Sequence, residues 1–296
     1  MSEQILFPAG EAPKTLENFL KRRFPIGYVR KLLRKHGVRV NGRRARAGDM
    51  VEPGDRIEIY IPFEEKPGSK TPASAPAAPL PVIFEDDSLL VIDKPPGLAV
   101  HEGRTVLKRE SLLGMLEARY RARGIVPRLV HRLDRETSGV LLVAKDEATA
   151  ERLKEAFERR EVEKEYLCLV AGRLPENRGT IDFPLPGRDG RMVRAATFYR
   201  VERRFRDTTL VRARIETGRM HQIRLHFAAL GHPVVMDRQH GDFAFNRRFR
   251  KAYRLDRQFL HASAVALEHK GRRRRWTAPL PPDLQSVVDA LAAEGS

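Results

Sequence analysis

The 296-residue sequence predicts an α+β fold: a mixed, largely antiparallel sheet flanked by helices, preceded by a small α+β module. Segments with strand patterns outnumber helical ones, and turn residues typical of hairpins often join them. This balance favours α+β over a doubly wound α/β sheet. A stretch rich in Pro and Ala at 64–81 separates the first sixty residues from the rest and predicts a linker. We therefore expect a module over 13–63 and a main domain over 82–296.

The module over 13–63 has a regular apolar pattern. Apolar residues recur at helical spacing over 16–20 and again over 29–36. Residues 38–40 and 57–61 alternate as strands with one buried face. The pattern predicts two helices followed by a small antiparallel sheet.

The charge of the chain favours a polyanionic partner. Lys and Arg number 56 against 39 Asp and Glu, a net charge of +17. Between Lys14 and Pro62 thirteen basic residues face five acidic ones, which gives +8. Such a face is often only solvated, but clustering on a helix and a hairpin favours phosphate binding. The predicted RNA-binding residues are Arg30, Lys31, Arg34, Lys35, Arg39, Arg43 and Arg44.

Other partners are excluded by what the sequence lacks. No apolar run approaches the ~20 residues of a membrane span, and no secretory signal is visible. The single cysteine, Cys168, permits neither an internal disulfide nor a cysteine-based zinc site. His221 and His226 are five residues apart, off the spacing of a helical zinc pair. We expect a cytoplasmic monomer with no metal, no nucleotide cofactor and no membrane partner.

Residues 131–139, His-Arg-Leu-Asp-Arg-Glu-Thr-Ser-Gly, stand directly before the apolar run 140–144, which reads as a buried strand. Asp134 lies between Arg132 and Arg135. It is either part of a structural ion pair or a carboxylate held ionised for chemistry, and the local spacing alone favours the ion pair.

Two further segments carry polar residues that can meet Asp134. Lys164 and Tyr166 lie two apart on a predicted strand and share a face, although a core-edge tyrosine with a snorkelling lysine fits equally well. Residues 217–226 open a predicted helix. Arg224 lies at the edge of its apolar stripe and can point inward, where it needs an anion. Asp134 is the obvious partner.

These motifs resemble those of a known family. His131-Arg132-Leu133-Asp134 with Thr137-Ser138-Gly139 resembles the signature of the RluA family of pseudouridine synthases. The resemblance extends over residues 82–285 and includes Asp93-Lys94-Pro95-Pro96-Gly97 and Gly218-Arg219-x-His221-Gln222-Ile223-Arg224. The module over 13–63 resembles the S4 RNA-binding domain. The resemblance therefore implies an enzyme that converts uridine in RNA to pseudouridine.

The resemblance also implies roles for residues. Asp134 would be the nucleophile, kept ionised by Arg224, in a reaction that breaks the N1–C1′ bond, turns the uracil and forms a C5–C1′ bond. Tyr166 would stack on the uracil and could take part in proton removal at C5. Arg132 would fill the gap left by the flipped uridine, and Arg135 would be only a solvated charge. The substrate-binding set is Arg132, Lys164, His131, Thr137 and Gln222, with Lys164 lining the pocket or pairing with phosphate.

One segment departs from the family pattern. Where Gly-Asp-x-x-Tyr-Gly is usual, this chain has Met236-Asp237-Arg238-Gln239-His240-Gly241, so the loop and its RNA contacts are expected to differ. Large-subunit ribosomal RNA is the expected substrate. A synthase acting on tRNA and a catalytically silent RNA-binding or ribosome assembly protein are the alternatives.

Overall fold

The computed structural model describes residues 2–8, 10–21, 29, 32–34, 36–60, 80–102, 106–187 and 191–294. The predicted linker falls outside these residues except at 80 and 81. Three of the predicted RNA-binding residues, Arg30, Lys31 and Lys35, also lie outside them. Within the part that the structure describes, no helix is long and apolar enough to cross a membrane.

The N-terminal domain is a small antiparallel sheet that packs against helical segments. Its sheet has the spatial order β1 (Ser2–Leu6), β6 (Arg56–Tyr60), β3 (Val38–Val40) and β4 (Arg43–Arg44), and a separate pair joins β2 (Lys14–Thr15) to β5 (Met50–Val51). Helix α1 (Leu16–Leu20) begins at Thr15, whose side chain accepts the N–H of Asn18. Sequence patterning did not foresee β1, which lies ahead of residue 13.

Alternating isoleucines and helical leucines build the core of this domain. Ile57 and Ile59 of β6 are fully buried and belong to one cluster with Leu16, Phe19 and Leu20 of α1. Val29, Leu32 and Leu33 are also helical and buried in the same cluster. The predicted period-2 and helical faces of this domain are confirmed.

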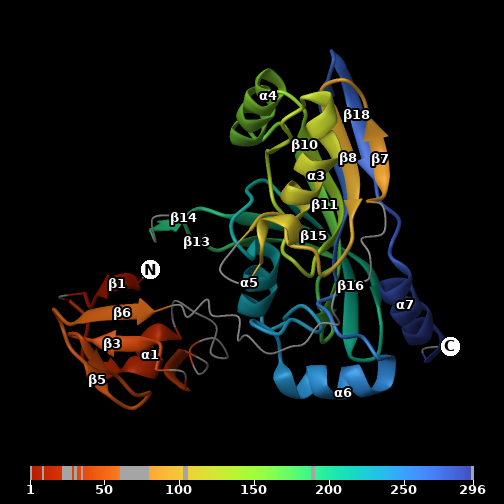
Figure 1. The fold of residues 1–296 in the computed structure, drawn as a ribbon. Coiled ribbons are helices and arrows are strands. Elements are labelled where there is room, and N and C mark those ends of the chain that lie inside the picture. The colour runs from red at the N-terminus through yellow and green to blue at the C-terminus, as the bar shows by residue number, and fades with distance from the viewer. Residues whose placement is uncertain are drawn as a thin grey trace.

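A large mixed sheet forms the second domain (Figure 1). Its spatial order is β12 (Arg178–Asp182), β15 (Ala196–Arg204), β16 (Thr208–Ile215), β11 (Glu163–Ala171), β17 (Leu260–His269), β10 (Ser138–Ala144), β8 (Leu89–Lys94) and β7 (Val82–Glu85). Strand β18 (Arg272–Thr277) pairs with β17, β9 (Arg128–Leu129) pairs with β10, and β13 (Leu185–Pro186) pairs with β14 (Met192–Val193). Among the strands that the structure describes, only β10 and β17 run parallel, so the predicted mixed, largely antiparallel sheet is confirmed.

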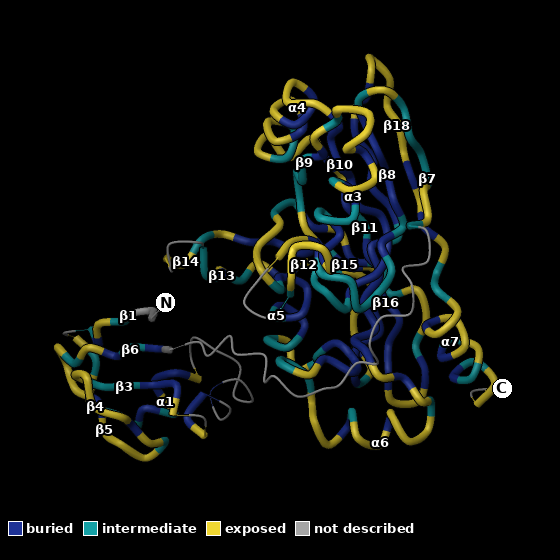
Figure 2. Tube along the Cα trace, in the orientation of Figure 1, coloured by how far each residue is buried: buried dark blue, intermediate teal, exposed yellow. Residues whose placement is uncertain are grey.

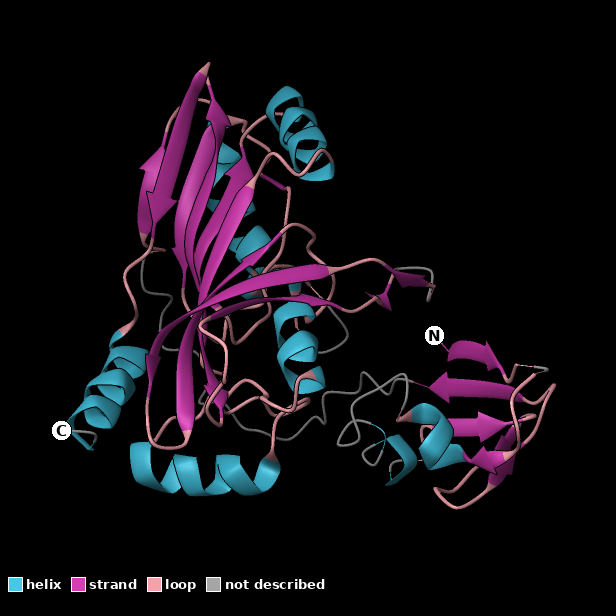
Figure 3. Cartoon of the chain, turned by 180° about the vertical axis from the view of Figure 1, so that it is seen from behind, coloured by secondary structure: helices cyan, strands magenta, loops and turns pink. Residues whose placement is uncertain are grey.

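Helices cover this sheet (Figure 3). They are α3 (Leu112–Tyr120), α4 (Glu147–Glu158), α5 (Gln222–Ala229), α6 (Phe243–Tyr253) and α7 (Pro282–Glu294), with short 3-10 turns η1 (Lys108–Glu110) and η2 (Arg121–Arg123). The Asp146 side chain accepts the N–H of Thr149 and is the N-cap of α4. Helix α6 was not predicted.

The two faces of each central strand serve different cores. Leu90, Leu141 and Val170 pack with α3 and α5 in one cluster. On the other face, Leu169 of β11 packs with α6 and α7 in a second cluster, while the alternate residues of β8 and β10 pack with α4 in a third. Strand β10 is buried along its whole length, as Figure 2 shows by its dark blue trace. The signature loop therefore enters the sheet at its most buried strand.

Candidate active site

The signature loop opens into a pocket. Asp134 sits in the turn before β10, where its carbonyl accepts the N–H of Thr137. The pocket's lining comes from this loop, from Tyr166 on β11, and from the segment that begins α5. The complete lining is Arg132, Leu133, Asp134, Thr137, Tyr166, Ile215, Gly218, Arg219, Met220, His221, Gln222, Ile223, Arg224 and Leu260.

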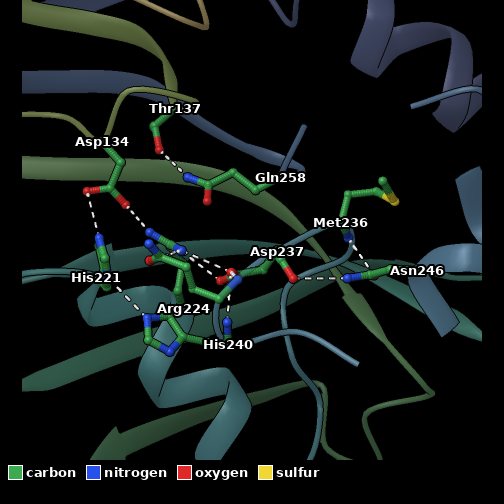
Figure 4. A network of polar contacts seen from close by, with 10 residues as sticks. Asp134, Thr137, His221, Arg224, Met236, Asp237, His240, Asn246 and Gln258 are labelled. Carbon is green, nitrogen blue, oxygen red and sulfur yellow. Dashed lines mark hydrogen bonds and ion pairs between the residues drawn. The ribbon is translucent and has the colours of Figure 1, made fainter. Parts of the chain in front are cut away.

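Arg224 joins the two carboxylates of the site (Figure 4). Its Nη1 donates to Oδ2 of Asp134 at 2.8 Å, which confirms the predicted ion pair. Its Nε and Nη2 donate to the two oxygens of Asp237 at 2.7 and 2.9 Å, and Nη2 also donates to Gln239. This fork–fork geometry is the strongest form of a guanidinium–carboxylate pair.

Both members of the Arg224–Asp237 pair are buried, and this burial fixes the position of the guanidinium. The side chain of Asp237 is fully buried and that of Arg224 is 5% exposed. Asp134 is the partly open member, with 19% of its side chain exposed. Asp237 therefore fixes the guanidinium from behind, and one remaining N–H is presented to Asp134.

Charges set the ionisation of Asp134. Burial alone would raise its pKa, but His221 and Arg224 outweigh burial and lower the pKa below its ordinary value. Burial lowers the pKa of His221 to about 4, so this imidazole is neutral at pH 7. The Arg224 guanidinium is then the charge that keeps Asp134 ionised at neutral pH.

A pair of imidazoles lies beside the same carboxylate. Nε2 of His221 is 3.9 Å from Oδ1 of Asp134, and Nδ1 of His221 is 3.0 Å from Nε2 of His240. His221 adopts the left-handed conformation at the start of α5. Sequence reasoning considered His221 only as a metal ligand and found no role for His240. The positions of these residues in the sequence could have indicated both of them. His221 lies within the 218–224 motif, and His240 replaces the aromatic residue of the family pattern.

The loop that holds Asp134 is tied to the turn after β8. The fully buried Lys94 donates from Nζ to the carbonyls of Pro95, Leu98 and Arg135 at 2.8 to 3.0 Å. Burial lowers the pKa of Lys94 to about 7, while three carbonyl acceptors match the three protons of its ammonium. Arg135 also donates to the carbonyl of Gly97. Arg135 is therefore a structural clamp, and its prediction as a solvated charge was wrong.

The far end of the loop is tied to β17. Gly139 has a φ of 112°, and a Cβ there would lie 2.2 Å from the carbonyl oxygen of Ala262, so the two strands could not approach with any other residue. Ser138 Oγ is 3.0 Å from Nδ1 of His261. Thr137, which lines the pocket, accepts a hydrogen bond from Gln258. These contacts fix the position of the signature loop.

Lys164 and Tyr166 share a face of β11, but only Tyr166 is among the residues that line the pocket. Tyr166 lines the pocket and is 7% exposed, and burial followed by the charge of Asp134 raises its pKa. Lys164 is 6% exposed and is not among the pocket-lining residues. Its ammonium lies 5.3 Å from the ring centre of Phe157, and burial lowers its pKa to about 8. The predicted lining role of Lys164 is therefore not seen.

Two other residues that were predicted to contact the substrate, His131 and Gln222, make hydrogen bonds within the protein. His131 lies outside the pocket lining: its Nε2 accepts the N–H of Leu142, and its ring lies 5.1 Å from that of Phe157. Gln222 lines the pocket, but its Oε1 accepts from Thr217 and from the N–H of Arg219. His131 thus anchors the loop, a correction to its predicted substrate role, and Gln222 shapes the turn before α5. Arg132 lines the pocket and is exposed, as a residue that meets RNA would be.

The departing segment keeps the essential contacts. Asp237 accepts the N–H groups of Gln239 and His240 in addition to pairing with Arg224. Met236 takes a φ of 62°, the left-handed conformation for which the glycine of the family pattern is suited. Its N–H is held by the side chain of Asn246 at 2.8 Å. The loop therefore supports Arg224 despite its altered residues.

In the N-terminal domain, the described residues of the predicted RNA-binding set face solvent. Arg34, Arg43 and Arg44 are exposed, and Arg39 is half-buried on β3. Arg39 pairs in register with Arg44 across the β3–β4 hairpin. The basic side chains of the hairpin are thus gathered on one small sheet edge.

Comparison with known proteins agrees with this architecture. The family model described as RNA pseudouridylate synthase matches residues 88–229, and the S4 domain model matches residues 16–57. The chain is 35% identical over 311 residues to ribosomal large subunit pseudouridine synthase C of Salmonella typhi, covering 98% of this chain and 97% of that protein.

Solved structures give the same answer for the fold. Human RNA pseudouridylate synthase domain containing 1 matches with a TM-score of 0.57 at 26% identity, covering 74% of this chain and 98% of that chain. Human RNA pseudouridylate synthase domain containing 4 has a TM-score of 0.61 at 24% identity, covering 72% and 93%, and shares the fold. With its buried signature loop, its pocket and its full-length relatives in agreement, this chain belongs to the RluA family of RNA pseudouridine synthases and carries an S4 domain.

Proposed function

We propose that this enzyme isomerises uridines of large-subunit ribosomal RNA, with Asp134 as its nucleophile. The observation that carries the assignment of Asp134 is its 2.8 Å ion pair with Arg224 inside the pocket. The choice of RNA is supported by the full-length relative, which is named a ribosomal large subunit enzyme. Mapping pseudouridine in ribosomal RNA from cells with and without the gene tests it, and sites that vanish only from tRNA would favour the tRNA alternative.

The geometry favours one oxygen of Asp134 for attack. Oδ2 accepts the hydrogen bond from Arg224, while Oδ1 lies 3.9 Å from His221 Nε2. We assign Oδ1 to the bond with the substrate, whether at the uracil ring or at C1′. The N1–C1′ bond then breaks, the uracil turns, C5 bonds to C1′, and the bond between Oδ1 and the substrate breaks, which frees the carboxylate. C5 releases its proton and N1 is protonated. The isomerisation balances without a cofactor, and none is proposed.

Tyr166 enters this scheme as a neutral ring. Its raised pKa disfavours a phenolate at pH 7, so we assign it to stacking on the uracil rather than to proton removal at C5. Arg132, exposed at the rim, is placed to occupy the gap that the flipped uridine leaves in the RNA. Lys164 is assigned to the wall behind Gly218, since its Nζ would be 3.8 Å from a Cβ at that glycine.

The Asp134–Arg224 ion pair predicts that kcat/KM changes little as the pH falls from 7 to 5. The depressed pKa of Asp134 means that its carboxylate protonates only as the pH falls below its usual value of 3.8. We expect kcat/KM for RNA to change by less than about twofold between pH 5 and pH 7, because kcat/KM reports the free enzyme. An acid limb with its midpoint at pH 5 or above would contradict this assignment.

We assign RNA capture to the S4 domain, taken as residues 13–63, joined by the linker at 64–81 to a catalytic domain at 82–296. Changing Arg39, Arg43 and Arg44 together to Gln should weaken RNA binding. The slope of log Kd against log salt should fall by about 2, since each phosphate contact contributes about 0.7 to 0.9. Filter binding at several salt concentrations measures this, with kcat at saturating RNA expected to stay unchanged. An unaltered slope would remove the hairpin from the RNA interface.

The remaining assignments concern the protein as a whole. We propose a cytoplasmic location, which the single, fully buried Cys168 supports, and a monomeric state. The alternative of a silent assembly factor is opposed by the intact Asp134–Arg224 pair. Unmodified RNA after incubation with the wild-type enzyme, together with tight binding, would favour that alternative.

A further inference from the structure

Helix α6 carries a row of basic side chains on one exposed face. Positions separated by three, four and seven residues align on a helix. The row consists of Arg247, Arg250 and Lys251 of α6, continued by Arg254 at the left-handed C-cap that ends the helix, with Phe243 at its head, and every member is exposed. Phe243 is 45% exposed, an unusual setting for a phenylalanine at a helix start.

The opposite face of α6 is used by the fold. Phe245 and Phe249 are buried in the cluster that they share with Leu284 and Val287 of α7. Because this apolar face is occupied, α6 has no free apolar side to insert into a lipid bilayer. Its basic row is therefore not required for packing, and membrane binding is disfavoured.

Within the described chain the row is poorly neutralised. Asp242 precedes the helix, but its carboxylate accepts the N–H groups of Ala244 and Phe245 as the N-cap. Asp256 pairs with Arg250 at 2.7 Å, and both side chains are more than 60% exposed, so this pair contributes little. Like charges three and four residues apart, such as Arg247 and Lys251, destabilise a helix. A polyanion would relieve this repulsion.

The position of α6 connects it to the active site. The helix begins directly after the loop 236–241, which contains Asp237, the buried partner of Arg224. Asn246 of α6 accepts the N–H of Met236 and donates to the carbonyl of Asp237 (Figure 4). The row therefore starts a few residues from the network that reaches Asp134, and helix α6 lies below α5 in Figure 1.

We propose that this row is a second RNA-binding surface, which holds the phosphate backbone of the RNA flanking the target uridine. The proposal rests on the proposed RNA substrate. Guanidinium groups bind phosphate oxygens in paired hydrogen bonds, and Phe243 offers a ring on which an unpaired base stacks. The surface lies on the catalytic domain, so it positions RNA at the pocket, whereas the S4 domain captures it.

The test compares two variants of the full-length protein that lose the same charge. Arg247→Gln/Arg254→Gln removes two row members, and Arg272→Gln/Arg274→Gln removes two exposed arginines from β18. The probe is an unmodified transcript of large-subunit ribosomal RNA. For the α6 variant we expect Kd to rise about tenfold at 0.1 M salt and the salt slope to fall by about 1.5, as for two lost phosphate contacts. KM should rise with kcat unchanged, and the β18 variant should match wild type.

The possible outcomes test the proposed surface independently of the proposed function. Equal binding by wild type and both variants, with pseudouridine formed, would overturn the surface and leave the function intact. Equal weakening by both variants would show only non-specific attraction and would also overturn it. Weakened RNA binding by the α6 variant alone would support the surface. This holds even if wild type forms no pseudouridine in the ribosomal transcript, a result that would contradict the proposed function. Loss of binding to phosphatidylserine vesicles without any loss of RNA affinity would assign the row to lipid instead.

Discussion

Replacing Asp134 with Asn should lower the rate of pseudouridine formation at least about 10³-fold while leaving RNA affinity within about threefold of wild type. Asn has nearly the same shape and can still accept from Arg224, but it lacks the anionic oxygen to which we assign the covalent bond. Release of tritium from RNA labelled at C5 of uridine measures the rate, and filter binding measures the affinity.

The matched control for this variant is Asp207→Asn, which makes the same change at an exposed position outside the pocket lining. It should retain wild-type rates. Full turnover by the Asp134 variant would remove this carboxylate from the chemistry. Loss of RNA binding in parallel with activity would instead point to a structural role.

Replacing Arg224 with Met should destabilise the protein by about 3 to 5 kcal/mol and abolish activity. The change leaves Asp237 as an unpaired carboxylate in a fully buried position, the costly way to break a buried ion pair. It also removes the cation that keeps Asp134 ionised. The midpoint of urea unfolding, followed by circular dichroism, measures the loss.

Two comparisons sharpen the Arg224 experiment. Arg200→Met breaks an exposed pair with Glu202 and should cost less than about 1 kcal/mol. Adding Asp237→Leu to Arg224→Met should recover part of the stability but none of the activity, because the buried charge is gone while Asp134 still lacks its partner. A loss below about 1 kcal/mol in Arg224→Met would contradict the network described for the site.

Short local patterns predicted the centre of the site well. The apolar run after the signature loop identified β10, and the position of Arg224 at the edge of an apolar stripe identified its partner as Asp134. Both inferences need only local periodicity and the cost of an unpaired buried charge. The fold class followed in the same way from strand and hairpin patterns.

Errors arose where tertiary contacts decide a residue's role. The imidazole of His131 accepts from Leu142, eleven residues later, and Arg135 bonds Gly97, thirty-eight residues earlier. No local pattern reports such partners. Helix α6 was missed because few of its residues are buried and its composition reads as a charged loop. Asp237 was noticed as a remnant of a motif, but its hold on Arg224 became visible only in three dimensions.

The ammonium of Lys94 ties the signature loop to the turn after β8. Carbonyl dipoles from two distant segments converge on one cationic centre, much as oxygen ligands surround calcium. Here the centre is a side chain of the same polypeptide, and because burial lowers its pKa to about 7, its positive charge is lost as the pH rises through 7. The position of the loop that carries Asp134 therefore depends on β8, the strand that carries Lys94.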